Sequence, residues 1–360
     1  SHASILARSL GIPCVVGAAG LLAAVADGCE LAIDADTGTV TISPDETTVK
    51  RFLDKDELAR KRRETAFAGK DAPAAALDGR RVFVYANAGS VDSIRKAVEN
   101  GAEGIGLFRT EFLFIGRKTM PSEDEQCEVY SEAARAAAGR PVTIRLLDIG
   151  GDKPAEYLAL PREENPYLGM RAIRVLLERR DVLRAQVRAI LRASLEGDVL
   201  LLVPMIADAE EMVEVRGEVE GCRVQLAKEG IAVPPLQVGT MIEIPSAALC
   251  AERLAKLSDF FSIGTNDLTQ YCMAADRGNA AVNRLYRTSH PAVLMLIART
   301  IHAARKAAIK VSICGEAASS PDLIPHFIGM GVDVLSVSPA LVPEIKQLVR
   351  ETAPAAEEEY

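Results

Sequence analysis

The chain has 360 residues, of which 49% are hydrophobic, and its 42 basic and 50 acidic residues give a formal net charge of −8. This length is enough to bury a large α/β core together with smaller pieces. The acidic balance argues against a general nucleic-acid binder, and the lack of Trp together with an aromatic content of 4% argues against a surface that stacks bases.

The seven cysteines are scattered along the chain, without a C-x-x-C motif or a paired-histidine spacing. This usage is typical of a reducing, cytoplasmic protein and argues against a disulfide scaffold or a zinc site. No apolar run reaches the ~18 residues that span a bilayer, and the N-terminus does not have the pattern of a secretory signal. We therefore expect no membrane insertion.

Residues 1–45 predict part of a small α/β domain. The pattern indicates a short helix over residues 3–10, a break at Gly11-Ile12-Pro13 and a strand over residues 14–17. Residues 30–34 and 39–43 flank a turn at Asp36-Thr37-Gly38 and predict a β-hairpin. Because the sequence opens without Met inside what looks like a motif, we expect this chain to be a fragment of a longer protein.

Residues 46–78 predict a charged helix followed by a linker. Residues 46–68 carry dense charge at helical spacing, which is typical of a solvated helix. Residues 71–78 are rich in Ala and Pro, a composition that favours a connecting segment.

From Arg81 onward, strand and helix patterns alternate. The strand candidates are residues 82–86, 104–108, 142–147, 200–205, 236–244, 260–264, 311–314 and 332–337. The helix candidates are residues 90–100, 122–138, 168–192, 209–229, 246–257, 291–308 and 321–330. Eight βα units predict a (β/α)₈ barrel, the TIM barrel fold, over residues 79–353, followed by an acidic tail at 354–360. The alternative, a doubly wound sheet, more usually stops near five or six strands.

Polar residues fall at the carboxyl ends of these strands, where a barrel builds its active site. They are Asn87, Arg109, Arg145 with Asp148 and Lys153, Glu243, Asn266 with Asp267, and Cys314 with Glu316. With Arg171, three arginines and a lysine would then face the carboxylates of Glu243 and Asp267 across one mouth. Unrelated surface ion pairs are the alternative, but scattered charge need not fall at strand ends this regularly.

The residue types at this mouth suit a small phosphorylated acid. Arg109, Arg145 and Arg171 can make bidentate contacts to phosphate and carboxylate oxygens. Glu243 and Asp267 are hard oxygen ligands at adjacent strand ends and suit Mg²⁺. The segment 259–279 concentrates this chemistry, because Asn266 and Asp267 are followed by Asp276-Arg277-Gly278-Asn279, although a T-N-D-L turn taken alone is more often a capped connection between a strand and a helix.

Two further residues are candidates for the chemical steps. The thiol of Cys314, at the end of the seventh barrel strand, could deliver a proton to a carbanion-like carbon, and simple packing is the alternative. The imidazole of His2 is a candidate phosphoryl acceptor before a predicted helix, and the alternatives are an expression remnant or a helix cap. The other three histidines have the pattern of structural residues.

Several motifs of the sequence resemble those of a known family. The motifs SHASILARSLGIPCVVG, GIGLFRTEFLF, RLLDIGGDKP, ENPYLGMRAIR, MIEIPSAAL, FFSIGTNDLTQY, DRGN, HPAV and CGE are similar to those of the phosphoenolpyruvate-utilising enzymes, and most similar to the C-terminal portion of the enzyme I group of the bacterial sugar phosphotransferase system. The match runs in one order from Ser1 to roughly Arg350.

The resemblance implies an activity and a role for each matched residue. It implies Mg²⁺-dependent phosphorylation of a histidine by phosphoenolpyruvate, release of pyruvate, transfer to the histidine phosphocarrier protein, and a homodimer. By motif position, His2 would carry the phosphoryl group, Glu243 and Asp267 would hold the metal, and Cys314 would donate the proton. The substrate contacts would come from Arg109, Arg145, Arg171, Arg277, Asn266 and Lys153.

The family's Gly-rich lead-in, the other half of its swivelling phosphohistidine domain and its carrier-docking helical domain are not in this sequence. We therefore expect the chain to bind phosphoenolpyruvate without phosphorylating His2 at a useful rate. Two alternatives stay open: a fragment of pyruvate phosphate dikinase or phosphoenolpyruvate synthase, and a phosphoenolpyruvate-sensing module without catalysis.

Overall fold

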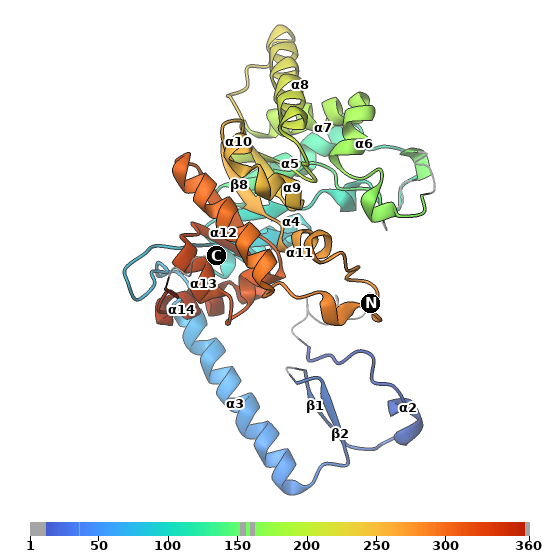
Figure 1. Ribbon diagram of the computed structural model, residues 1–360, viewed down its shortest axis with the longest axis vertical. Helices are drawn as coiled ribbons and strands as arrows, with labels where there is room; N and C mark the ends of the chain where they lie inside the picture. The colour runs from blue at the N-terminus through green and yellow to red at the C-terminus, as the bar shows by residue number, and fades with distance from the viewer. Residues whose placement is uncertain (1–11, 36, 152–155, 159–162, 357–360) are drawn as a thin grey trace. The chain divides into compact units, whose positions relative to one another are not determined.

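The structure, a computed structural model, describes residues 12–35, 37–151, 156–158 and 163–356. The chain divides into two compact units, Ser1–Gly69 and Lys70–Tyr360 (Figure 1). The helix expected at residues 3–10, His2 and Lys153 lie outside the described residues.

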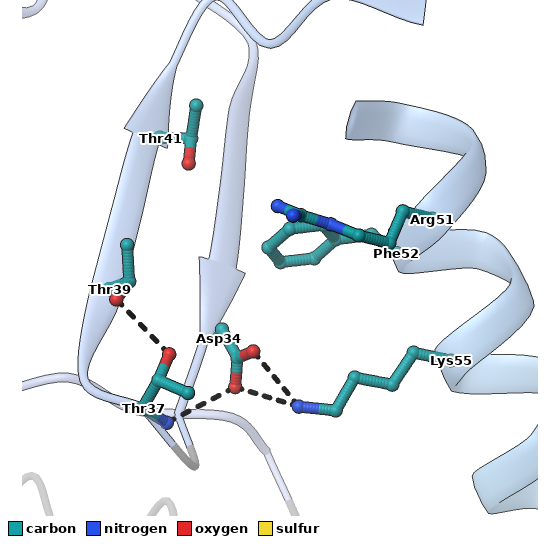
Figure 2. A pocket seen from close by; sticks show the side chains of 7 residues that line it. All are labelled: Asp34, Thr37, Thr39, Thr41, Arg51, Phe52 and Lys55. Carbon is teal, nitrogen blue, oxygen red and sulfur yellow. Dashed lines mark hydrogen bonds and ion pairs between the residues drawn. The ribbon is translucent and has the colours of Figure 1, made fainter. Parts of the chain in front are cut away.

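The first unit contains α2 (Leu21–Ala24), β1 (Leu31–Asp34), β2 (Thr39–Ile42) and α3 (Glu46–Ala68). β1 and β2 pair antiparallel, with Leu31 opposite Ile42, so the predicted hairpin is confirmed. The predicted charged helix is also confirmed: the carboxylate of Asp45 caps α3 by accepting the Thr48 N–H at 2.7 Å, and Ala66 is its one buried residue. Figure 2 shows Lys55 of α3 donating to Asp34 of β1 at 2.9 Å.

The strand expected at residues 14–17 is wrong, because these residues are irregular. A strand needs a neighbour with which to exchange backbone hydrogen bonds. In the described part of this unit, the sheet consists of β1 and β2 alone. The apolar pattern of residues 14–17 was therefore not enough to form a strand.

The second unit is a closed barrel of eight strands, as predicted. Its strands are β3 (Phe83–Ala88), β4 (Ile105–Phe108), β5 (Val142–Arg145), β6 (Val199–Val203), β7 (Gln237–Ile242), β8 (Phe260–Ile263), β9 (Lys310–Ile313) and β10 (Val334–Val337). All neighbouring pairs are parallel, and β10 closes the barrel by pairing with both β3 and β9. Because every strand runs the same way, all eight carboxyl ends meet at one end of the barrel.

The helices that cover the barrel follow the predicted order with four differences. Confirmed helices are α4 (Val91–Glu99), α5 (Glu123–Ala136), α8 (Ala209–Lys228), α12 (Pro291–Lys306) and α13 (Ile324–Met330). The helix expected at 168–192 is divided into η3 (Pro166–Leu168), α6 (Ile173–Glu178) and α7 (Arg180–Ala193), and the one expected at 246–257 into α9 (Pro245–Leu249) and α10 (Ala251–Ala255). α11 (Thr265–Met273) and α14 (Val342–Glu351) were not predicted.

The breaks between α6 and α7 and between α9 and α10 lie at residues that leave helical geometry without a glycine or proline to signal it. Arg179 has φ −106° and ψ 67° between α6 and α7, and Cys250 has φ −100° and ψ 17° between α9 and α10. Short 3₁₀ turns complete the connections: η1 (Glu111–Leu113), η2 (Glu156–Leu158), η4 (Asn283–Leu285), η5 (Glu316–Ser319) and η6 (Pro339–Leu341).

The Ala- and Pro-rich segment 71–78 is packed against the barrel rather than free. Ala74 and Ala76 are buried in the core of the second unit. The Val82 N–H donates to the Ala74 carbonyl at 3.0 Å, and the Leu77 N–H donates to the Thr352 carbonyl at 3.0 Å. The contacts thus divide the chain after Gly69, and domain boundaries at 45 and 78 stay a prediction.

Candidate active site

Eight of the predicted site residues are described, and they lie at the carboxyl end of the barrel. Arg109 follows β4, Arg145 ends β5, Glu243 follows β7, and Cys314 follows β9. Asn266 and Asp267 lie in the first turn of α11, directly after β8. Arg171 precedes α6, and Arg277 follows α11.

A chain of alternating charges connects these loops. The Arg145 Nη2 lies 2.8 Å from Oε1 of Glu111 and 3.3 Å from Oδ2 of Asp148. Asp148 in turn pairs with Nε of Arg171 at 2.8 Å, and Nη1 of Arg171 lies 2.9 Å from Oδ1 of Asp267. The last step joins Asp267 to Nη1 of Arg277 at 3.8 Å. This ion-pair chain, buried except at Arg277, fixes the positions of the side chains that follow β4, β5 and β8.

All the N–H donors of the Arg171 side chain are used within this ion-pair chain. A guanidinium has five N–H groups. The Nε donates to Asp148 at 2.8 Å, Nη1 donates to Asp267 at 2.9 Å and to the Tyr271 hydroxyl at 3.1 Å, and Nη2 donates to Asp148 at 2.9 Å and to Asp267 at 3.4 Å. Burial disfavours its charged form, but the two carboxylates outweigh this and raise its pKa.

The backbone is strained directly after Arg171. The next residue, Ala172, has φ 52° and ψ −121°, a conformation that side chains other than that of glycine rarely adopt. Nearby, both carboxylate oxygens of Glu163 accept the Met170 N–H, at 3.1 and 3.0 Å. The Tyr271 hydroxyl donates to the Tyr167 carbonyl at 2.6 Å and ties the loop to α11.

Arg145 and Arg109, by contrast, have side-chain N–H groups without an acceptor among the described residues. The Arg145 Nε is buried and has no hydrogen-bond partner among the described residues. The side chain of Arg109 is exposed at the mouth and makes no hydrogen bond or ion pair within the described parts of the chain. Desolvation by the surrounding protein atoms and the positive charges of Arg145 and Arg277 lower the pKa of Arg109. A bound anion would offset these effects, because its negative charge stabilises the protonated guanidinium.

Glu243 and Asp267 offer carboxylate oxygens beside these arginines. Glu243 is buried, and its Oε1 accepts the Met205 N–H at 2.7 Å. Burial, and then the negative charges of Asp267 and Asp148, raise the pKa of Glu243 to about 8. Two hard oxygen donors that repel one another suit a divalent cation such as Mg²⁺, which usually takes one or two protein carboxylates. Within the described ranges, no three His, Cys, Asp or Glu side chains form a metal-binding group of their own.

Glycines bring the backbone close to this pair and to the neighbouring loop. A Cβ on Gly264 would lie 2.8 Å from Oε2 of Glu243. A Cβ on Gly315 would overlap the Thr265 hydroxyl. The Asn266 Oδ1 accepts the Glu316 N–H at 2.9 Å, so α11 and the loop after β9 are held together, and the Nδ2 group of Asn266 has no hydrogen-bond acceptor among the described residues.

Cys314 is buried, with 5% of its surface exposed. Its N–H donates to the Ile263 carbonyl at 3.1 Å, and its thiol donates to the same oxygen at 3.5 Å. Burial raises the pKa of Cys314 to about 11. The thiol is therefore neutral and keeps its proton at pH 7.

Sequence reasoning missed several residues that complete the site. Glu111 was part of a quoted motif but received no role, and its Oε1 accepts from Arg145 at 2.8 Å and from the Asp148 N–H at 3.3 Å. Gln186 of α7 is fully buried, and its Oε1 accepts the Leu147 N–H at 2.9 Å. The signal for Glu111 was a carboxylate two residues after a strand-end arginine. No local signal pointed to Gln186.

Comparisons with known proteins place the sequence in a family. A family model described as "PEP-utilising enzyme, PEP-binding domain" matches residues 63–353, and one described as "PEP-utilising enzyme, mobile domain" matches residues 1–38.

Curated relatives carry the name phosphoenolpyruvate-protein phosphotransferase. The protein of Haemophilus influenzae is 44% identical over 97% of this chain and 61% of its own length. The protein of Bacillus subtilis is 44% identical over 94% of this chain and 60% of its own length. The chain thus spans about three fifths of the length of these relatives. Among solved structures, a citrate lyase of Burkholderia xenovorans covers 80% of this chain and 79% of that one, with 17% identity and a TM-score of 0.48.

Proposed function

Because the chain belongs to the PEP-utilising enzymes, we propose that it is the phosphoenolpyruvate-binding part of a phosphoenolpyruvate-protein phosphotransferase. The observation that carries this proposal is the set of open cationic donors, on Arg109 and at Nε of Arg145, beside two carboxylates and a protonated thiol. A small anion with a phosphate and a carboxylate would use these donors together. The names of the curated relatives support the same activity.

In this proposal each arginine has a defined part. Arg109, Arg145 and Arg277 would bind the phosphate and carboxylate oxygens, with Asn266 adding an amide donor and Lys153 a further cation. Arg171 would contribute by fixing the positions of Asp148 and Asp267, because its N–H donors are already shared between these two carboxylates. Glu243 and Asp267 would hold Mg²⁺, which would neutralise charge that develops on the enol oxygen as phosphate leaves.

The proposed reaction breaks the bond between phosphorus and the enol oxygen, and the bonding electrons go to that oxygen. The lone pair of an imidazole nitrogen, that of His2 in this chain, forms the new bond to phosphorus. The Cys314 thiol then gives its proton to C3 of the pyruvate enolate, keeps the S–H electron pair as a thiolate, and regains a proton from water. Arg109 and Arg145 would stabilise the charge that moves through this sequence.

We expect phosphoenolpyruvate to bind this chain only together with a divalent ion. The carboxylate of Asp267, and above pH 8 that of Glu243 as well, would otherwise repel the anionic ligand. Calorimetric titration with and without Mg²⁺ measures this directly. Equal affinity in EDTA would contradict the proposal.

Mg²⁺ affinity should also depend on pH in a stated direction. A divalent ion binds the ionised carboxylate, so it must displace the proton that the raised pKa of Glu243, about 8, keeps in place at neutral pH. Affinity should therefore fall about tenfold for each unit of pH below 8 and level off above it. Mg²⁺ titrations from pH 6 to pH 9 test this, with Glu243→Gln as a control that should bind weakly and without that slope. A flat profile in the unsubstituted chain would contradict it.

The remaining parts of the proposal concern partners and location. We propose onward transfer to the histidine phosphocarrier protein, a homodimer and a cytoplasmic location. No helix in the described segments is long and apolar enough to cross a bilayer. Incubating the full-length protein with labelled phosphoenolpyruvate distinguishes this activity from a sensor, which would not be labelled, and onward passage of the label to the histidine phosphocarrier protein distinguishes it from a dikinase or synthase, which would not label that protein.

A further inference from the structure

The backbone around Cys314 is held from three sides. β8 holds its N-terminal side, because the Cys314 N–H donates to the Ile263 carbonyl at 3.1 Å. α11 holds the following loop through Asn266 and Glu316, at 2.9 Å. The third contact comes from β3: Nδ2 of Asn87 donates to the Cys314 carbonyl at 2.9 Å.

Asn87 reaches Cys314 across a strand. β10 lies between β3 and β9, and the same Nδ2 group donates to the carbonyl of Ser336 in β10 at 3.0 Å. The register between β3 and β4 shifts at Ala86 and Asn87. Such an irregularity bends the strand locally and can redirect a side chain, and these features are frequent next to active sites.

Ser336 fixes which way the Asn87 amide faces. Its hydroxyl donates to Oδ1 of Asn87 at 2.7 Å, and Ser336 is fully buried. The amide therefore uses its oxygen for the hydroxyl and both of its N–H donors for the two carbonyls. A flipped amide would place oxygen against two carbonyl oxygens, which cannot donate.

Gly106 makes room for this arrangement. A Cβ at position 106 would overlap Oγ and Cβ of Ser336. The side chain of Ser336 can thus take its place only because β4 has a glycine there. Residues from β3, β4 and β10 together determine the position of one peptide group at the end of β9.

We propose that Asn87 is a positioning residue for proton delivery, which acts by fixing the peptide after Cys314, and that Ser336 acts through Asn87. This inference rests on the proposed function, in which the S–H bond of Cys314 breaks and its proton goes to C3 of the enolate. The thiol can protonate C3 only if its S–H bond is kept pointing at that carbon. A misplacement of about 1 Å can cost about 10²-fold in rate.

The chain offers a matched control. Asn100, which follows α4, also donates its Nδ2 to a distant backbone carbonyl, that of Pro339, at 2.8 Å. Asn100→Ala removes the same kind of hydrogen bond as Asn87→Ala without touching the loop after β9. Any loss that comes from weakened packing alone should appear in both variants.

The test compares Asn87→Ala and Asn100→Ala in two backgrounds of the full-length protein, one with Cys314 and one with Cys314→Ala. We expect Asn87→Ala to slow single-turnover pyruvate formation by about 10²-fold when Cys314 is present and to add no loss when it is absent. Calorimetric binding of phosphoenolpyruvate should be unchanged. An equal loss in both backgrounds, or the same loss in Asn100→Ala, would overturn the proposal.

Ser336→Ala provides a milder second variant if Asn87→Ala does not fold. It should slow pyruvate formation by a smaller factor, again only when Cys314 is present, and equal slowing in both backgrounds would overturn the proposal. If the unsubstituted protein forms no pyruvate, the proposed function is wrong. Alkylation of Cys314 by iodoacetamide then tests separately whether Asn87 fixes the position of Cys314. Asn87→Ala should then be alkylated at Cys314 faster than Asn100→Ala, and equal rates would refute it.

Discussion

Replacing Cys314 by alanine is expected to slow pyruvate formation by about 10²–10⁴-fold in the full-length protein, the range for loss of a general acid. Binding of phosphoenolpyruvate should barely change, because the open donors that would hold it belong to Arg109 and Arg145. Single-turnover pyruvate formation and calorimetric binding separate the two effects.

The pH dependence of this step follows from the state of the thiol. Burial raises the pKa of Cys314 to about 11, so the proton is present throughout the neutral range and is lost only as the pH rises toward 11. Cys314 should therefore add no acidic limb to the rate profile, and the rate that depends on it should decline only at alkaline pH. The unfolded thiol loses its proton at a lower pH, so the stability that the buried neutral thiol contributes is likewise present below its unfolded pKa and lost as the pH rises.

Cys222 is a suitable control for the substitution. It is also buried, in α8, and burial likewise raises its pKa to about 11. Cys222→Ala should reduce stability through lost packing and leave the rate of pyruvate formation unchanged. If Cys314→Ala weakens binding and leaves the single-turnover rate intact, then Cys314 is a packing residue and the proposed proton donor is wrong.

The barrel could be predicted from sequence because each strand carries its own signal. Short apolar runs alternate with helix-length segments, and a run such as residues 260–264 needs no distant information to be recognised. The helices were harder to predict where the break depends on tertiary packing. Neither Arg179 nor Cys250 marks a helix end by residue type, and α11 begins within a G-T-N-D sequence whose residues also favour turns.

The partners within the site could not be predicted for a different reason. Strand ends indicated that Arg145, Asp148 and Asp267 would lie near one another. No sequence pattern indicated that Arg171 would divide its five donors between two carboxylates and a tyrosine hydroxyl. Asn87 and Ser336 are 249 positions apart, and only closure of the barrel brings them together. Such pairings depend on register, which a one-residue shift would change entirely.

Arg171→Leu is expected to lower the free energy of unfolding by about 3–5 kcal/mol, because removing one partner of a buried ion pair leaves an uncompensated charge. The carboxylates of Asp148 and Asp267 are both buried and would each lose charged hydrogen bonds. Urea unfolding of the chain, monitored by the barrel's circular dichroism, measures the change. Arg253→Leu is the control, because Arg253 and its partner Glu210 are each 62% exposed, and loss of such a pair costs at most about 1 kcal/mol.

The pH dependence of the Arg171→Leu defect tests its electrostatic origin. Without Arg171, the buried carboxylates can become neutral only by taking up protons, so the folded variant should bind more protons than the unsubstituted protein. Its stability deficit should therefore narrow as the pH is lowered and widen as the pH is raised. A second replacement, Asp148→Leu, should recover part of the loss in the same background, because one of the unpaired charges is then gone. A deficit that is independent of pH and is not reduced by Asp148→Leu would mean that Arg171 stabilises the barrel by packing, and that the ion-pair chain does not hold Asp267 in position.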